Sequence, residues 1–302
     1  WKATRIYVDM PEKPDTASSP LVLSIDLDEW YHCRWATGYE KSIWRDTATF
    51  FRDVYGSDKP RGDLSPPAEW LLAMLDEMKV KATFFILGEV ARWYPELVRR
   101  IADNGHETAC HGMRHQDMSS LDRAQFENQL GNARKILEDT AQASVVGFRA
   151  PNLVVEPYLA DVLGELGFEY DSSVCPSRGV RGKYAGMAAS PQNPYRIGAD
   201  VQTPGDGKLW ELPIPTMPGI LFPACTGVAT RLFTSYWSRF ALWHWQRKGP
   251  VMYYFHPYEI WNDEIPDDGR TYVKLFMRNR GRVMQRRVRK ILDIYKGRIT
   301  TA

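Results

Sequence analysis

Short runs of apolar residues alternate along most of the chain with longer stretches in which apolar residues recur at helical spacing. A short run has the length and composition of a buried strand, and a longer stretch has the period of a helix with one packed face. Strands are predicted at 21–25, 82–87, 108–110, 145–148, 168–170, 209–212 and 251–255. Helices are predicted between them, at 67–79, 88–103, 122–139, 156–166 and 227–247.

This alternation predicts an α/β fold, in which right-handed crossovers build a parallel sheet covered by helices. About seven strand–helix units favour a closed or nearly closed barrel over two separate domains. We therefore expect an N-terminal extension at 1–20 and a single barrel domain at 21–302. Two irregular stretches, 32–65 and 175–207, interrupt the rhythm and are rich in Gly, Pro and aromatic residues.

Composition adds little to this picture. Hydrophobic residues make up 44% and charged residues 25%, as in ordinary globular domains. No apolar run reaches the length of a membrane span. The chain begins without the apolar core of a secretory signal, which favours a cytoplasmic location, although a signal already removed would look the same. The four cysteines form no C-x-x-C pair, so we expect free thiols.

The net charge of +2 conceals a strongly basic C-terminal segment. Residues 270–298 contain eleven Lys or Arg and one acid. Apolar residues at helical spacing predict a helix at about 280–297 that packs on one face and exposes its arginines to solvent. This helix could additionally contact an anionic surface. Nucleic acid is not an expected partner, because no nucleic-acid-binding motif accompanies the charge.

Charged or ligating residues follow the apolar strands at their C-terminal ends, where parallel α/β sheets gather their reactive groups. They are Asp26, Asp28, Glu29, His111, Arg149, Asp171 and His256.

The motif His111-Gly-Met-Arg-His115 places two imidazoles four residues apart. Such a pair is often a surface feature, but here the first histidine follows a buried strand. Asp26 and Asp28 alternate by two, so both point to one side of their strand. One carboxylate can complete a two-histidine, one-carboxylate metal site with an open position for water, and the other can act as a base. The alternative is that Asp28 or Glu29 only caps a loop.

His256 follows five apolar residues and precedes Pro257, so its position is rigid. Its ring can donate a proton near neutral pH. The alternative is a core histidine satisfied by a partner such as Asp171.

These motifs resemble those of the NodB-type polysaccharide deacetylases, carbohydrate esterase family four, over roughly residues 20–260. The matching blocks are 81–85, 105–107, 111–115, 148–151, 170–173 and 255–257. The resemblance implies a distorted (β/α) barrel of about seven units and an enzyme that removes acetyl groups from amino sugars or glycans.

Carried over by position, the resemblance also implies roles for individual residues. The metal ligands would be Asp28, His111 and His115, and the ion would be one divalent metal, zinc first, with cobalt or nickel possible. The catalytic set would be Asp26 as base, Arg149 holding that base, His256 as general acid, Asp171 as partner of His256, and a backbone N–H of the Pro151–Asn152 turn for the oxyanion.

Two positions depart from the family pattern. Leu27 separates two acids that are usually adjacent, so Glu29 remains an alternative to Asp28 as the ligand. Asn152 stands where an aromatic residue is usual, which leaves a backbone N–H role intact.

The expected function is metal-dependent deacetylation of an N-acetylated amino sugar or glycan in bacterial surface-polysaccharide biosynthesis, with a lipid-linked or nucleotide-linked precursor as substrate. One alternative is an allantoinase-like hydrolase of ureides or imides. Another is an inactive glycan-binding module, which would be expected to lack the base or the acid, whereas Asp26 and His256 are both present.

Overall fold

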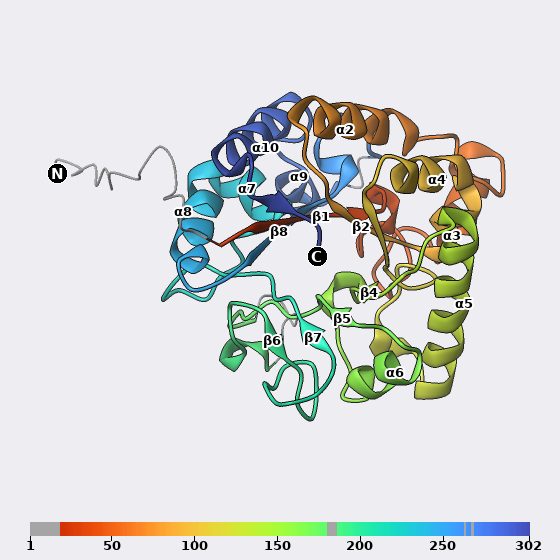
Figure 1. The fold of residues 1–302 in the computed structure, drawn as a ribbon. Helices are drawn as coiled ribbons and strands as arrows, with labels where there is room; N and C mark the ends of the chain where they lie inside the picture. Colours follow the sequence, from red (N-terminus) through yellow and green to blue (C-terminus); the bar gives the residue numbers. More distant parts are fainter. Residues whose placement is uncertain (1–18, 180–185, 263, 267–268) are drawn as a thin grey trace.

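The computed structural model describes residues 19–179, 186–262, 264–266 and 269–302, so most of the expected N-terminal extension and part of the 175–207 stretch lie outside it. A curled sheet forms the centre, with helices around its outer side (Figure 1). Seven strands run parallel in the order β7-β5-β4-β3-β2-β1-β8. Their bounds are β1 Leu21–Leu27, β2 Thr83–Ile86, β3 Glu107–Cys110, β4 Gly147–Phe148, β5 Tyr170–Asp171, β7 Trp210–Glu211 and β8 Val251–Phe255.

Two short strands complete the sheet. β6 (Tyr195–Arg196) pairs antiparallel with β7, and β9 (Ile299–Thr300) pairs parallel with β1. Within the described residues the strand path does not close between β6 and β8, so the barrel is a half-barrel. The predicted α/β class with about seven parallel strands is confirmed.

The register of the central strands aligns their C-terminal ends. Every residue of β1 is buried, and Ile25 lies opposite both Phe84 of β2 and Phe255 of β8. Since the β2–β3 pairing continues this alignment, the residues that follow β1, β3 and β8 emerge at one edge of the sheet.

Two predicted helices are each split in two. The stretch 88–103 forms α3 (Gly88–Trp93) and α4 (Pro95–Asp103), because Pro95 has no N–H to continue the helix. The stretch 227–247 forms α7 (Gly227–Phe233) and α8 (Ser235–Gln246), separated at Thr234, whose φ is 103°. The remaining predicted helices appear as α2 (Ser65–Met78), α5 (Arg123–Ala141) and α6 (Leu159–Glu165).

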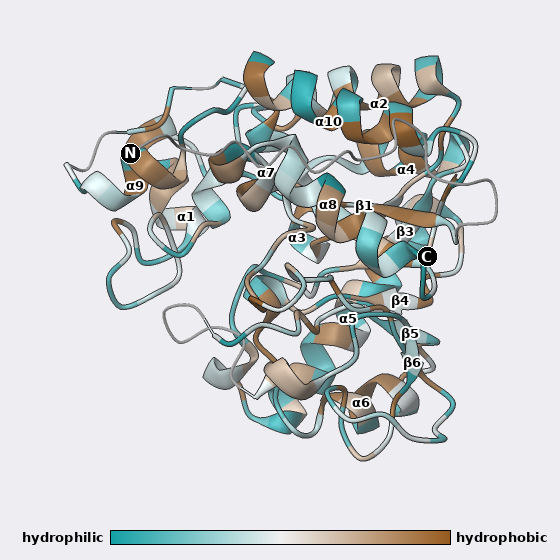
Figure 2. Cartoon of the chain, turned by 90° about the vertical axis from the view of Figure 1, so that its left-hand side faces the viewer, coloured by the Kyte–Doolittle hydropathy of each residue, from teal (hydrophilic) through white to brown (hydrophobic). Residues whose placement is uncertain are grey.

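The basic segment near the C-terminus contains helix α10, Arg282–Tyr295. Its buried face carries apolar residues, namely Met284, Val288, Ile291, Leu292 and Tyr295, and it packs against α7 and α8. Figure 2 shows hydrophobic and hydrophilic residues together in α10 and α2, as expected of helices with one packed face. No helix of the described part is both long and apolar enough to cross a membrane.

The stretch 32–65, expected to be irregular, contains α1 (Thr47–Phe50) and a π-helical turn at Phe51–Tyr55. Its aromatic side chains form a second core with residues from the other end of the chain, including α9 (Thr271–Phe276). The buried members of this core are Trp30, Tyr31, Trp35, Ala36, Phe50, Phe51, Tyr258 and Val273.

Candidate active site

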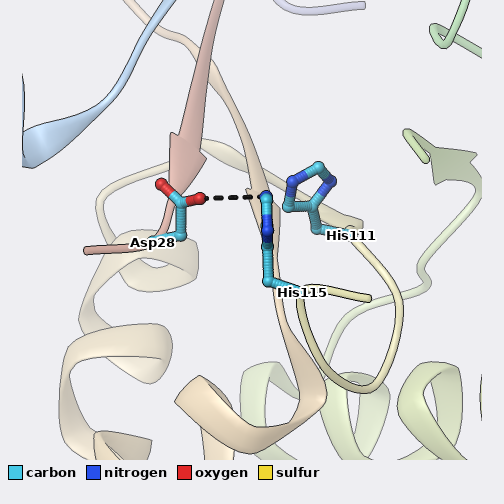
Figure 3. A group of neighbouring side chains, drawn as sticks. All are labelled: Asp28, His111 and His115. Carbon is cyan, nitrogen blue, oxygen red and sulfur yellow. Dashed lines mark ion pairs between the residues drawn. The ribbon is translucent and has the colours of Figure 1, made fainter. Parts of the chain in front are cut away.

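Three potential metal ligands converge where β1 and β3 end. Asp28 follows β1, His111 follows β3, and His115 lies on the loop beyond it, with ligand atoms all within 4.8 Å of one another. Asp28 Oδ2 lies 3.3 Å from His115 Nε2, and the three side chains face a common space (Figure 3). Between the histidines, Gly112 adopts φ +86°, which lets the chain turn directly after His111.

The chemistry of this trio fits a divalent metal. His111 Nδ1 donates to the carbonyl oxygen of Arg149 at 2.8 Å, so its Nε2 keeps a lone pair. That Nε2 and Asp28 Oδ1 are buried without a hydrogen-bond partner among the described residues. Burial lowers the pKa of His111 to about 4, which keeps the ring neutral as a ligand must be. Burial raises the pKa of Asp28 to about 6, against the opposing charge of His256, and a bound cation would favour the ionised carboxylate.

Glu29, the alternative ligand, is oriented differently. Its backbone N–H donates to His32 Nδ1 at 3.0 Å, and its carboxylate is not among the ligand atoms that converge with the two histidines. Asp28 rather than Glu29 therefore belongs to the trio that the structure brings together.

Asp26 is held beside the trio by a fully buried arginine. Arg149 Nη1 donates to Asp26 Oδ1 at 2.5 Å. Two more hydrogen bonds hold the guanidinium in place: Nε donates to the carbonyl oxygen of Ser172, and Nη2 donates to the hydroxyl of Ser172. The guanidinium also lies 4.0 Å from the centre of the Phe85 ring. This leaves Asp26 Oδ2 facing the side chain of His256 at 3.8 Å from Nε2.

His256 emerges directly after β8 and completes the cluster. Its Nε2 lies 4.0 Å from Asp28 Oδ1, and its Nδ1 lies 3.0 Å from Glu259 Oε2. Burial alone would lower the pKa of His256, but the carboxylates of Asp28, Glu259 and Asp26 raise it to about 9. The imidazole is therefore protonated near neutral pH and can donate a proton.

The predicted partnership of Asp171 with His256 is wrong. Asp171 accepts from the Ser173 hydroxyl at 2.6 Å and lies against Glu211, and burial raises the pKa of both carboxyls. It belongs to β5, which β1 to β4 separate from β8 in the sheet, whereas Glu259 lies one short turn beyond His256. The sequence signal for Glu259 was its three-residue spacing from His256 across Pro257, which favours contact within a turn.

The Pro151–Asn152 segment forms a short 3-10 turn, Pro151–Leu153, in which Asn152 has φ 56°. The Asn152 side chain donates to Asp117 Oδ1 at 3.1 Å and to the Tyr39 hydroxyl, and it lies 3.5 Å from His115 Nδ1. Sequence reasoning missed Tyr39 and Asp117, because they lie in loops without strand or helix periodicity.

A cavity of about 460 Å³ lies beside the turn that carries the histidine pair. It is lined by Glu89, Arg92, Trp93, Met113, Arg114, Gln116, Gln129 and Asn132. It does not include the trio itself, although Met113, Arg114 and Gln116 flank His115 in sequence.

Residues 58–170 match the family model for polysaccharide deacetylase. This segment of the chain is similar to the polysaccharide deacetylase family. This match contains both histidines of the trio and Arg149, and it confirms the resemblance to NodB-type deacetylases. A second family model, for a domain of unknown function, matches residues 172–296, and this segment contains His256.

Curated relatives are similar to this chain over part of their length. A chitooligosaccharide deacetylase from Sinorhizobium fredii is 40% identical over 82 residues, 27% of this chain and 38% of that protein. A peptidoglycan-N-acetylglucosamine deacetylase from Bacillus cereus is 35% identical over 99 residues, 32% of this chain and 34% of that protein. These matches therefore span little more than a third of each relative.

Two solved structures share the fold of this chain over nearly its whole length. A putative polysaccharide deacetylase from Mycobacterium smegmatis has a TM-score of 0.58 at 20% identity, covering 97% of this chain and 91% of that chain. An allantoinase has a TM-score of 0.56 at 13% identity, covering 94% and 86%. The fold is thus shared with both kinds of hydrolase, whereas the two sequence relatives named above are deacetylases.

Proposed function

We propose that this protein is a metal-dependent hydrolase that removes the acetyl group from an N-acetylated amino sugar or glycan. The observation that carries the proposal is the convergence of Asp28, His111 and His115 beside Asp26, which Arg149 holds, and His256. A metal site, a base and an acid are the parts that amide hydrolysis needs.

Asp28, His111 and His115 would hold the metal, and two imidazoles with one carboxylate suit zinc, cobalt or nickel better than magnesium or calcium. When bound, such an ion supplies a Lewis acid for the acetyl carbonyl and lowers the pKa of water.

Asp26 accepts the proton that the attacking water loses, with Arg149 keeping its carboxylate in place. A backbone N–H of the Pro151–Asn152 turn stabilises the oxyanion. His256 then transfers its Nε2 proton to the departing nitrogen, so that the C–N bond breaks to give a neutral amine and acetate.

Substrate-panel assays separate this function from its rivals. The purified protein, loaded with zinc, should release acetate from N-acetylated amino sugars and should not hydrolyse allantoin. Asp26→Asn serves as a matched control with the same metal site and should release little acetate. Hydrolysis of allantoin without acetate release would favour the ureide hydrolase, and absence of both reactions would favour a binding module.

The setting that we propose is bacterial surface-polysaccharide biosynthesis in the cytoplasm, on a lipid-linked or nucleotide-linked sugar. α10 supports peripheral contact with an anionic surface, because Arg282, Arg286 and Lys290 are exposed on it. Sedimentation with anionic phospholipid vesicles tests this contact, which should weaken as salt rises. Binding that is equal on neutral vesicles would contradict it.

A further inference from the structure

A chain of buried charged side chains leads from the candidate active site into the protein interior. His256 Nδ1 lies 3.0 Å from Glu259 Oε2, and Glu259 Oε1 accepts from Arg231 Nε at 2.7 Å. The side chains of Glu259 and Arg231 are both fully buried. A buried ion pair is weak evidence for stability, because apolar residues of similar size usually stabilise a fold as well or better. Its position behind His256 points to another role.

Glu259 constrains the ring of His256 through a single oxygen. Oε2 accepts from the backbone N–H of His256 at 2.9 Å as well as from the ring Nδ1–H. The carboxylate therefore fixes both the main chain and the side chain of the same residue. With Nδ1–H committed to Glu259, the other ring nitrogen, Nε2, faces Asp26 and carries the proton that can be transferred.

Arg231 in turn constrains Glu259. Its Nη1 donates to the carbonyl oxygens of Phe276 and Arg278 at 2.6 and 2.9 Å, which ties the guanidinium to the end of α9. Space for the carboxylate depends on Gly227 at the start of α7, because a Cβ there would lie 1.9 Å from Glu259 Oε2. The pair is therefore held from both sides by the surrounding backbone.

We propose that Glu259 is a positioning residue for the general acid His256, and that Arg231 holds Glu259 in the orientation this requires. This inference rests on the proposed function, since it concerns how the acid of that reaction is aimed. It also gives a role to residues 172–296, the segment matched by a domain of unknown function. That segment contains His256, Glu259 and Arg231, whereas the histidine pair and Arg149 lie in 58–170.

The test uses a double variant, Glu259→Leu with Arg231→Met, which replaces the ion pair with apolar groups and leaves no buried charge unpaired. Turnover is measured on an N-acetyl sugar, whose amine must be protonated to leave, and on an activated acetyl ester, whose leaving group needs no proton. We expect the amide kcat to fall by on the order of 10²-fold, with KM and ester turnover little changed. Glu259→Gln keeps an acceptor oxygen and should retain more amide turnover than the double variant.

Two controls separate positioning from stability. Val288→Ala removes a buried methyl pair from α10 and should lower Tm while leaving the amide-to-ester ratio unchanged. Glu77→Gln removes an exposed Glu–Arg pair, with Arg289, and should change neither quantity. If the double variant leaves the amide-to-ester turnover ratio unchanged, whether both rates fall equally or neither falls, the proposal is overturned.

A second readout does not depend on turnover. Nitrogen NMR of the histidine rings should show a hydrogen-bonded Nδ1–H at His256 in the wild type, and that signal should be lost in the double variant. An identical His256 spectrum in both proteins would also overturn the positioning role. A wild type that releases no acetate would refute the proposed function instead, and the spectrum would still decide whether Glu259 holds the ring.

Discussion

Two aspartates only two residues apart have different surroundings at the end of β1. Asp26 is bonded to the buried guanidinium of Arg149, and Asp28 faces the imidazoles of His111 and His115. The local partner of each carboxylate, rather than its residue type, decides which suits a base and which suits a metal ligand. Substitution of Asp26 is therefore expected to lower turnover, and substitution of Asp28 is expected to lower metal content.

Asp26→Asn should abolish most acetate release yet keep the metal, because the proposed task of this residue is proton transfer. A loss on the order of 10²–10⁴-fold is typical for one general base. Asp28→Asn should weaken metal binding instead. Elemental analysis of both purified variants checks this, and an empty site in Asp26→Asn with a filled one in Asp28→Asn would reverse the assignment.

His106 offers a pH-dependent prediction away from the site. Its Nδ1 accepts from the Ala82 N–H at 3.3 Å, and burial lowers its pKa from 6.5 to about 4. Because the unfolded chain binds this proton more readily, the stability contribution is complete above pH 6.5 and is lost as pH falls toward 4. Between pH 7 and 4.5 the free energy of unfolding should therefore fall by roughly 2 kcal/mol less in His106→Gln than in the wild type.

Urea unfolding at several pH values measures this difference. His244→Gln is the matched control, because His244 is less buried and should leave the wild-type pH dependence almost unchanged. Parallel pH profiles for wild type and His106→Gln would contradict the assigned role of burial at His106.

At the scale of elements, helix α10 connects the basic segment to the fold and to the buried ion pair. Arg287 on this helix donates to the carbonyl oxygens of Thr230 and Arg231 in α7. Its apolar face packs under α7 and α8, so its contribution should appear as stability rather than as chemistry.

Leu292→Ala should lower the free energy of unfolding by about 2–5 kcal/mol, because Leu292 is fully buried and its truncation leaves a cavity. Lys290→Ala, an exposed neighbour on the same helix, should stay within about 0.5 kcal/mol of wild type. Thermal and urea unfolding of both variants checks the prediction. Similar effects of the two substitutions would mean that this face of α10 is not packed.

The elements that the sequence predicts well are those in which hydrophobic residues recur with a clear period. β1 and β8 were found from their apolar runs, and the polar residues behind them from the geometry of parallel sheets. Periodicity gave no warning of the breaks at Pro95 and Thr234, nor of α1 within an aromatic-rich stretch. At Pro95 the missing N–H ends the helix, and around α1 the packing of aromatic rings determines the backbone, so neither follows from the hydrophobic period.

At the scale of the whole molecule, the site is assembled from distant segments around one sheet edge. The positions of Asp26, Asp28, His111, Arg149 and His256 at this edge follow from strand order, which the sequence pattern implied. The partner of His256 did not follow, because the choice between Asp171 and Glu259 depends on the path of a short turn after β8. Strand ends are thus predictable from sequence, whereas side-chain partners within loops require coordinates.

The central claim is that Asp28, His111 and His115 hold one metal on which deacetylation depends. The most direct measurement is the rate of acetate release from an N-acetylated amino sugar as zinc is added to chelator-stripped protein. We predict negligible release without metal, a rise that saturates near one equivalent, and no rise for His111→Ala. Full activity in the stripped wild type, or a normal zinc response in His111→Ala, would contradict the account.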